Sequence, residues 1–172
     1  MTVFKEALMS PVSRPVTLPN PLLPAADWAD RFTLGLTADG VTAREAARLA
    51  LENPPVWVRG LMALRNALVR PIGLKGAADV MPGAQTVIAG FPVVSADDDR
   101  VVLGYDDWHL DFRIVIDVFS DRPSGKTLSV MTLVHRNNLF GRLYLAAVMP
   151  FHKLIVRRAL SSVGRRVLSS QR

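Results

Sequence analysis

Residues 136–152 read RNNLFGRLYLAAVMPFH, and this stretch decides the fold. As a helix it would be apolar on every side, with one arginine, Arg142, inside it. A helix of this composition has to be enclosed by other elements, and burying an unpaired guanidinium is costly. We therefore expect a long C-terminal helix clasped by a sheet, in which Arg142 either pairs with a carboxylate or reaches solvent along its stem.

Pro150 divides the predicted helix into two parts. Proline lacks a backbone N–H and clashes with the carbonyl four residues earlier, so we expect a kink or a helix restart there. The part before Pro150 is predicted to be the clasped part, and His152 is expected to bond backbone groups that the proline leaves free. The part after it is amphipathic and is predicted to lie on the surface. Its apolar face holds Ile155, Val156, Ala159 and Val163, and its basic face holds Lys153, Arg157, Arg158 and Arg165.

Four segments before this helix have the composition of strands. They are residues 87–95, 100–105, 108–119 and 126–135, separated by short stretches that are rich in aspartate. A parallel pair would need a crossover of about a dozen residues or more, so these short links predict antiparallel neighbours.

Further towards the N-terminus, a strand and two helices are predicted. Residues 27–36 are strand-like by their Trp and Phe content. Thr42 and Glu45 have the spacing of a capping box, which predicts a helix that runs to about Leu51. Apolar residues at helical spacing predict a second helix over residues 56–69. The expected order is a strand, two helices, an antiparallel sheet and a long helix, which is an α+β arrangement.

The first 24 residues differ from the rest of the chain. Residues 10–24 contain five of the twelve prolines, which favours an extended arm over a helix or a central strand. Residues 25–172 are expected to form a single domain, because 172 residues with 49% hydrophobic composition are enough for one sizeable core.

The composition also bears on the compartment. The absence of cysteine excludes disulfides and thiolate chemistry and permits a reducing environment. The first ten residues carry Lys5 and Glu6 and no apolar run of a secretory signal. The longest uncharged apolar run, residues 143–151, has nine residues, whereas a spanning helix needs about 20. We therefore expect a cytoplasmic protein.

Charge is distributed unevenly along the chain. Residues 1–120 hold 11 basic and 14 acidic side chains, whereas residues 121–172 hold 10 basic and one acidic. The basic segment could face an anionic membrane, an acidic protein or the acidic remainder of the same chain. It has no interleaved aromatic residues beyond Phe151, so no nucleic-acid partner is expected.

Candidate site residues lie on the strand predicted over residues 108–119. His109, Asp111, Arg113 and Asp117 alternate there with apolar residues. In one arrangement the apolar set faces the helix and the polar set faces water. In the other the polar set points into a cavity, and Asp111 neutralises Arg142 or Arg113 to form a polar floor for a ligand.

A reaction and a metal site are considered from the same residues. His135 could act as a general base beside Asp111, with Arg142 stabilising developing negative charge, or it could be a satisfied residue at a strand end. The three histidines have no spacing of a metal site, and the adjacent aspartates 97–99 read as a solvated hairpin turn. We expect no metal and no cofactor, because the chain also lacks a GxGxxG motif.

HLDFR at 109–113, followed by RNNLFGRLYLAAVMPFHKLIVRRAL at 136–160, resembles an uncharacterised bacterial family of unknown function. Members of that family are similar to the START-like, or SRPBCC, superfamily. The resemblance covers about residues 25–160 and is most specific at 141–144 and 150–152. It implies a helix-grip fold, in which a curved antiparallel sheet wraps a long kinked C-terminal helix and two shorter helices follow the first strand. It also implies a deep cavity for a hydrophobic small molecule, but no particular activity.

Three classes of function follow. The first is a module that binds a lipid, polyketide or quinone-like molecule between the sheet and the helix. The second is an enzyme that acts on such a ligand by acid/base chemistry, and the third is an interaction protein that docks through its basic C-terminal helix. An uncovered edge strand would also allow a homodimer. The residues expected to line the cavity are Tyr105, Leu110, Phe112, Ile114, Met131 and Leu143.

Overall fold

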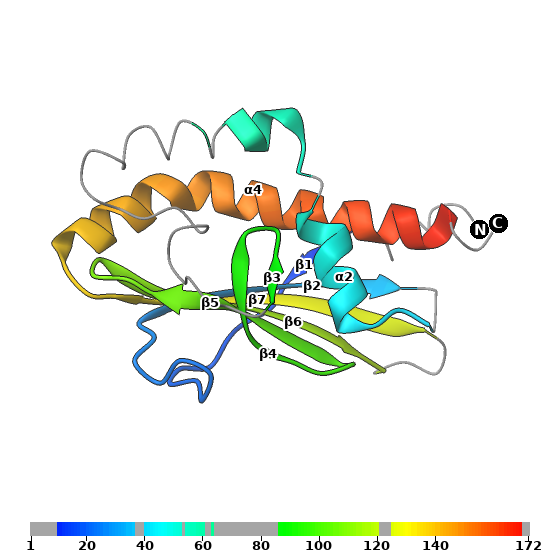
Figure 1. Cartoon of the computed structure of the whole chain (residues 1–172), viewed down its shortest axis with the longest axis horizontal. Coiled ribbons are helices and arrows are strands. Elements are labelled where there is room, and N and C mark those ends of the chain that lie inside the picture. The colour runs from blue at the N-terminus through cyan, green and yellow to red at the C-terminus, as the bar shows by residue number, and fades with distance from the viewer. Residues whose placement is uncertain are drawn as a thin grey trace.

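The protein is described by a computed structural model, which places residues 10–36, 40–52, 54–60, 63, 86–120 and 125–169. Seven strands form one antiparallel sheet, and a 31-residue helix, α4 (Leu139–Ser169), lies along one face of it (Figure 1). The order across the sheet is β1-β2-β7-β6-β5-β4-β3. The strands are β1 (Val12–Ser13), β2 (Trp28–Leu36), β3 (Val87–Ile88), β4 (Phe91–Ala96), β5 (Arg100–Asp106), β6 (Leu110–Phe119) and β7 (Lys126–Arg136).

The predicted fold class is confirmed. The chain is α+β, with an open antiparallel sheet, a long C-terminal helix and short helical segments after the first long strand, an arrangement consistent with the helix grip. One predicted strand differs from the structure, because residues 87–95 form two strands around a turn at Ala89 and Gly90. Both turn residues have positive φ, 52° and 85°. An Ala-Gly pair is a weak turn signal, since alanine rarely adopts this conformation.

The first predicted helix is confirmed with its cap. Helix α2 spans Ala43–Leu51, and the side-chain oxygen of Thr42 accepts a hydrogen bond from the backbone N–H of Glu45 at 3.2 Å. This bond satisfies one of the donors that a helix start leaves free. Residues 56–60 and 63 are helical, in agreement with the second prediction, and the other residues of 56–69 lie outside the described part.

Burial along α4 corrects the prediction for its two parts. The helix continues through Pro150 without a restart. Two of its seven buried residues precede the proline and five follow it: Gly141 and Leu145, then Val156, Leu160, Val163, Gly164 and Val167. A helix that is apolar on every side does not specify which side packs, whereas the amphipathic part has one apolar face to bury. The basic, amphipathic part is therefore the one held in the core.

The main core lies between the sheet, α2 and the second half of α4. Val156, Leu160 and Val163 of α4 pack there with Ala46 and Ala47 of α2 and with the helix-facing side chains of the sheet. Burial of this apolar surface is the main stabilising contribution to the fold. The long helix is anchored mainly by its C-terminal half.

The other face of the sheet is covered by the N-terminal arm. Val12 of β1 pairs with Thr33 of β2, and the chain then runs across the face opposite α4, where Leu23 packs with Met131 and Leu133 (Figure 1). The apolar set of β6 faces the helix, as the first of the two arrangements predicted. Asp111, Arg113 and Asp117 of the polar set lie on the other face, which the arm partly covers, whereas His109 precedes β6 and packs against α4.

Candidate functional site

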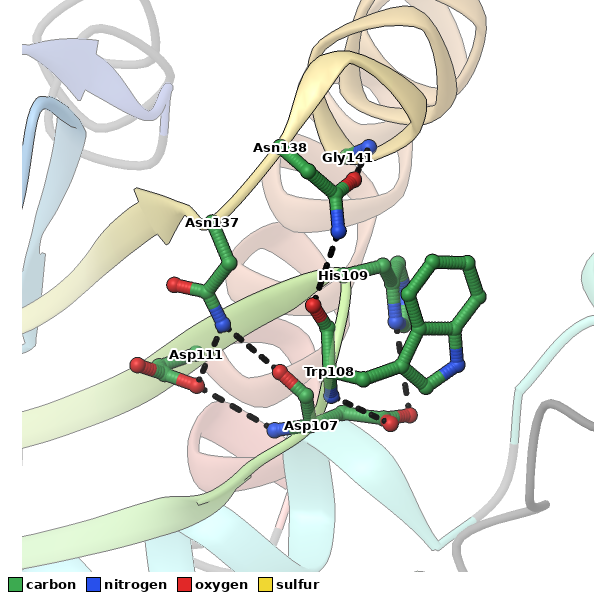
Figure 2. A network of polar contacts seen from close by, with 7 residues as sticks. All are labelled: Asp107, Trp108, His109, Asp111, Asn137, Asn138 and Gly141. Carbon is green, nitrogen blue, oxygen red and sulfur yellow. Dashed lines mark hydrogen bonds and ion pairs between the residues drawn. The ribbon is translucent and has the colours of Figure 1, made fainter.

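The N-terminus of α4 is bonded to the turn between β5 and β6 (Figure 2). The side-chain oxygen of Asn138 accepts from the backbone N–H of Gly141 at 3.0 Å and caps the helix. The amide nitrogen of Asn138 donates to the carbonyl of Trp108 at 2.9 Å. A single side chain therefore caps the helix and joins it to the hairpin.

The neighbouring Asn137 completes this connection. Its side-chain nitrogen donates to the carbonyl of Asp107 at 2.7 Å and to the carboxylate of Asp111 at 3.1 Å. The same oxygen of Asp111 accepts from the backbone N–H of Asp107 at 3.2 Å (Figure 2). Asp111 thus holds the turn in place, which is a structural role that the sequence analysis did not consider.

Close packing explains the glycine in this motif. The backbone N–H of Asn137 donates to the carbonyl of His109 at 3.1 Å, and a Cβ atom at position 141 would overlap that same carbonyl oxygen. Gly141 is buried, so the overlap could not be relieved by movement into solvent. The backbone of the hairpin therefore lies directly against α4 at Gly141, the third residue of the helix.

His109 is enclosed by aromatic rings. Its side chain is 1% exposed, and its ring lies 5.3 Å from that of Tyr144, 5.5 Å from that of Trp108 and 5.9 Å from that of Phe140. The ring nitrogen Nδ1 lies 3.4 Å from a carboxylate oxygen of Asp107. His109 is thus part of the packed junction and does not belong to a water-facing polar row.

The three catalytic candidates do not form one cluster. Asp111 and His135 are directly opposite in the β6–β7 register, but no hydrogen bond or ion pair joins their side chains in the described structure. Both lie on the sheet face opposite α4. Arg142 is exposed on α4, and no carboxylate of the described ranges pairs with it. The guanidinium of Arg142 therefore reaches solvent, which is one of the two alternatives that the sequence analysis gave for a charge in this apolar segment.

The six residues expected to line a cavity divide between three places. Tyr105, Leu110, Phe112 and Ile114 lie on the helix-facing side of the sheet. Met131 is 2% exposed on the opposite side, under the arm, and Leu143 is 63% exposed on α4. Met131 and Leu143 are therefore not part of the sheet–helix interface. The alternation of side chains along β7 places Met131 on the opposite face of the sheet, and the position of Leu143 around the axis of α4 directs it away from the sheet.

A polar cluster that the sequence analysis missed lies in this interface. Nε2 of His152 is 3.2 Å from each carboxylate oxygen of Asp30 and 3.4 Å from the hydroxyl of Thr132. Its ring also packs edge-on against Trp28 at 5.9 Å. The His152 side chain therefore contacts the sheet and does not cap the backbone groups freed by Pro150.

A sequence signal for this cluster existed. Alternation along β2 places Asp30 on the same face as Phe32 and Leu34, which are 2% and 1% exposed. A carboxylate on an otherwise buried apolar face requires a polar partner. The partner could not be chosen from the sequence, because His152 is 122 positions away.

Solvent reaches the interface around this cluster. The side chains of His152 and Asp30 are 20% and 11% exposed, and Trp28, Phe112 and Ile114 are also only partly buried. Phe112 packs edge-on against Tyr105, with ring centroids 4.7 Å apart. The first half of α4 and the sheet thus leave aromatic and polar groups accessible side by side.

A hollow of about 950 Å³ lies at the β4–β5 turn. The predicted solvated hairpin is confirmed there, since Asp97, Asp98 and Asp99 are exposed and the N–H of Asp97 donates to the carbonyl of Arg100 at 2.7 Å. A side-chain hydrogen bond from Arg100 to Asp117, at 2.6 Å, raises the pKa of the arginine above its ordinary value. Within the described residues, no group of three or more His, Asp or Glu side chains could hold a metal ion.

Helix α4 has the length and composition of a membrane span, in contrast to the expectation from its shorter uncharged run. An 18-residue window has a mean hydropathy of 1.4, and 17% of that window is buried. Length and composition are weak evidence for a span, since core helices pass the same test. The low burial is the more informative value, because it means that much of this apolar window faces outwards.

The chain matches a known protein family. Residues 22–159 match the family described as "Protein of unknown function (DUF2867)", and the chain belongs to that family. The match includes both the Asn137–Gly141 junction and the Asp30–His152 pair. No curated protein and no solved structure gives a significant match.

Proposed function

We propose that the protein binds a hydrophobic small molecule between the sheet and the first half of α4. The observation that carries this proposal is the polar cluster of Asp30, Thr132 and His152 on an apolar face, in which the His152 side chain is partly exposed. Binding sites for small molecules typically combine an apolar lining with a few polar groups that fix orientation. A lipid, polyketide or quinone-like molecule fits this chemistry.

The apolar part of the site is formed by partly buried rings. Trp28, Phe91 and Phe112 lie around the helix-facing side of the sheet, and Phe91 packs edge-on against Phe112 at 5.9 Å. A ligand that covered these rings would remove further apolar surface from water, which favours binding by about 25 cal/mol per Å². We expect the burial of these rings to contribute most of the free energy of ligand binding.

The polar part of the site would select the ligand. A carboxylate only accepts, so the proton on Nε2 of His152 points to Asp30; Nδ1 of the neutral ring could accept a hydrogen bond from a ligand, and the hydroxyl of Thr132 can donate or accept. A ligand hydroxyl or carbonyl that replaced solvent here would be held at one orientation. Asp30 would fix the tautomer and position of the histidine ring.

The fold order and the resemblance to the START-like superfamily support this proposal. In that superfamily the ligand lies between the sheet and the C-terminal helix. We propose that the chain is a START-like protein with a cytoplasmic location, in keeping with its lack of cysteine.

Native mass spectrometry, followed by organic extraction, tests the proposal. We expect a discrete small molecule in stoichiometric amount, lost in His152→Ala and retained in the matched control His135→Ala, which changes a histidine on the opposite face of the sheet. An apolar fluorescent probe added to protein that is isolated empty should bind through the aromatic rings. If neither an endogenous molecule nor the probe binds, or if both variants retain an endogenous molecule equally well, the proposed site is wrong.

Acid/base catalysis on the bound molecule is a second candidate. The observation that favours it is the Asp30–His152 pair itself, because a histidine oriented by a carboxylate can transfer protons near neutral pH. Once the ligand is known, turnover should depend on pH and be lost in His152→Ala. Turnover that persists in this variant and is lost in His135→Ala would instead support the pair formed by Asp111 and His135.

A further inference from the structure

One face of α4 exposes a row of large apolar side chains. Leu139 is 70% exposed, Leu143 63%, Phe151 46% and Leu154 44%. Large apolar side chains that are exposed singly are common, but a contiguous row marks a surface that contacts another apolar phase. No described element of the chain covers these four residues.

The helical geometry makes this row continuous. Leu139, Leu143, Pro150 and Leu154 lie within about 60° of one another around the helix axis and extend over about 22 Å. Ala146 and Ala147 are exposed between them. We call this set of six residues the apolar stripe, with Phe151 at its edge.

The charged side chains of α4 beside the apolar stripe all have one sign. Arg142 and Lys153 are exposed along its margin, and α4 contains no carboxylate. Further along α4, Arg157 and Arg158 are also exposed; the guanidinium of Arg157 lies over the ring of Phe32 on the sheet, at 5.2 Å, and that of Arg158 lies over the ring of Trp57, at 5.8 Å. A partner for this face has to be apolar in the middle and anionic at the margin.

We propose that α4 docks this face on the surface of an anionic lipid bilayer. Helices with an apolar face and basic margins lie in the plane of the interface, with the apolar side chains among the acyl chains and the basic ones at the lipid phosphates. The long stems of Arg142 and Lys153 allow their charges to reach the headgroups. Arg142 therefore acts at the margin of the membrane contact.

The packing of α4 favours a surface position over a span. Leu145, Val156 and Leu160 on the opposite side of the helix are buried against the sheet. Moving α4 across the bilayer would remove these side chains from the core and expose the sheet to water. The helix can dock without any such change, because the apolar stripe is already exposed.

The proposal does not depend on the small-molecule site. Co-sedimentation of the full chain with vesicles of phosphatidylcholine alone, and of phosphatidylcholine with phosphatidylglycerol in equal parts, tests it. We expect binding to the mixed vesicles that weakens as salt is raised. The double variant Leu139→Asp, Leu143→Asp should lower the partition coefficient at least about tenfold, because it removes two apolar anchors and adds two negative charges.

Two further variants serve as a control and as a test of the basic side chains. Val94→Asp is the matched control, since Val94 is 55% exposed on β4 rather than on α4, and it should bind as the unchanged protein does. The charge reversal Arg142→Glu, Lys153→Glu should abolish the preference for anionic vesicles. All variants should keep the circular dichroism of the folded chain, because every changed residue is exposed.

Three results would overturn the proposal. The first is no binding of the unchanged protein to either kind of vesicle. The second is equal binding by the unchanged protein and by Leu139→Asp, Leu143→Asp. The third is a stable dimer, seen by analytical ultracentrifugation, that Leu139→Asp, Leu143→Asp dissociates while vesicle binding is absent. That result would identify the apolar stripe as an interface between two copies.

Discussion

The two halves of α4 differ in a way that their composition does not suggest. The first half is more apolar, yet it exposes Leu139 and Leu143 and buries only Gly141 and Leu145. The second half is basic, yet it buries five residues against the sheet and α2. Hydrophobicity alone therefore does not decide which part of a helix enters a core. A part of a helix enters the core when it has one well-defined apolar face and when other elements, here the sheet and α2, offer an apolar surface to that face.

Each half is held by a different kind of contact. The second half packs Leu160 and Val163, both 0% exposed, against the main core. The first half is held at its start by hydrogen bonds of Asn137 and Asn138 and by the close approach of Gly141 to His109. A dense apolar core therefore fixes one end of the helix, and a polar junction fixes the other, and no described element covers the apolar stripe between them.

Truncation of the buried half should have the largest effect on stability. Leu160→Ala removes a fully buried side chain and should lower the free energy of unfolding by about 3 kcal/mol. Leu143→Ala, at a 63% exposed position of the same helix, should change it by less than about 0.5 kcal/mol. Urea denaturation measures both. Similar losses in the two variants would contradict the difference between the halves.

The glycine at the junction should give the next largest effect. Gly141→Ala places a Cβ against the carbonyl oxygen of His109 and should cost about 2 kcal/mol, although alanine favours helices. Gly60→Ala is the control, because no atom lies within 4 Å of the added Cβ there, and it should be neutral or stabilising by up to about 1 kcal/mol. Thermal unfolding of both variants makes the comparison. If Gly141→Ala also stabilised the fold, the close approach would be wrong.

Loss of the helix cap should be smaller. Asn138→Ala removes the bond to the N–H of Gly141 and the bond to the carbonyl of Trp108, and should cost about 1 kcal/mol. Asn138→Asp retains the acceptor that caps the helix and loses only the donor, so its loss should be less. Equal losses would mean that the bond to Trp108, and not the cap, determines the role of this residue.

Arg142 should give the smallest effect on stability. Because its side chain is exposed, Arg142→Ala should change the free energy of unfolding by less than about 0.5 kcal/mol. Chemical denaturation measures it, and a loss of several kcal/mol would mean that the guanidinium has a buried partner. Its expected contribution is to vesicle binding, where the effect should depend on salt.

Much of the fold could be predicted from local patterns. The capping box at Thr42, the alternation along β6 and the short aspartate-rich links each reflect a constraint that acts within a few residues. The turn at Ala89 and Gly90 was missed because alanine gives no signal for a positive φ. The burial of α4 was assigned to the wrong half because it depends on α2 and the sheet, which are distant in sequence.

The candidate site was predictable only in part. Strand alternation, which is a local property, predicts that Phe112 and Ile114 share one face, but it left open which face of the strand is turned to the helix. The pairing of Asp30 with His152 depends on the rotation of a helix over a sheet, which no local pattern specifies. Asp111 has a different role from the one expected, because Asn137 and the turn use its carboxylate oxygen.

Thiol labelling tests the difference between the halves most directly. The chain has no cysteine, so Leu143→Cys and Leu160→Cys each introduce a single reporter on one helix. In the native protein, we expect the thiol at position 143 to react with Ellman's reagent as fast as a free thiol does, and to be shielded when phosphatidylglycerol-containing vesicles are added. The thiol at position 160 should react only after unfolding. Equal protection of both thiols in the absence of vesicles would contradict the account.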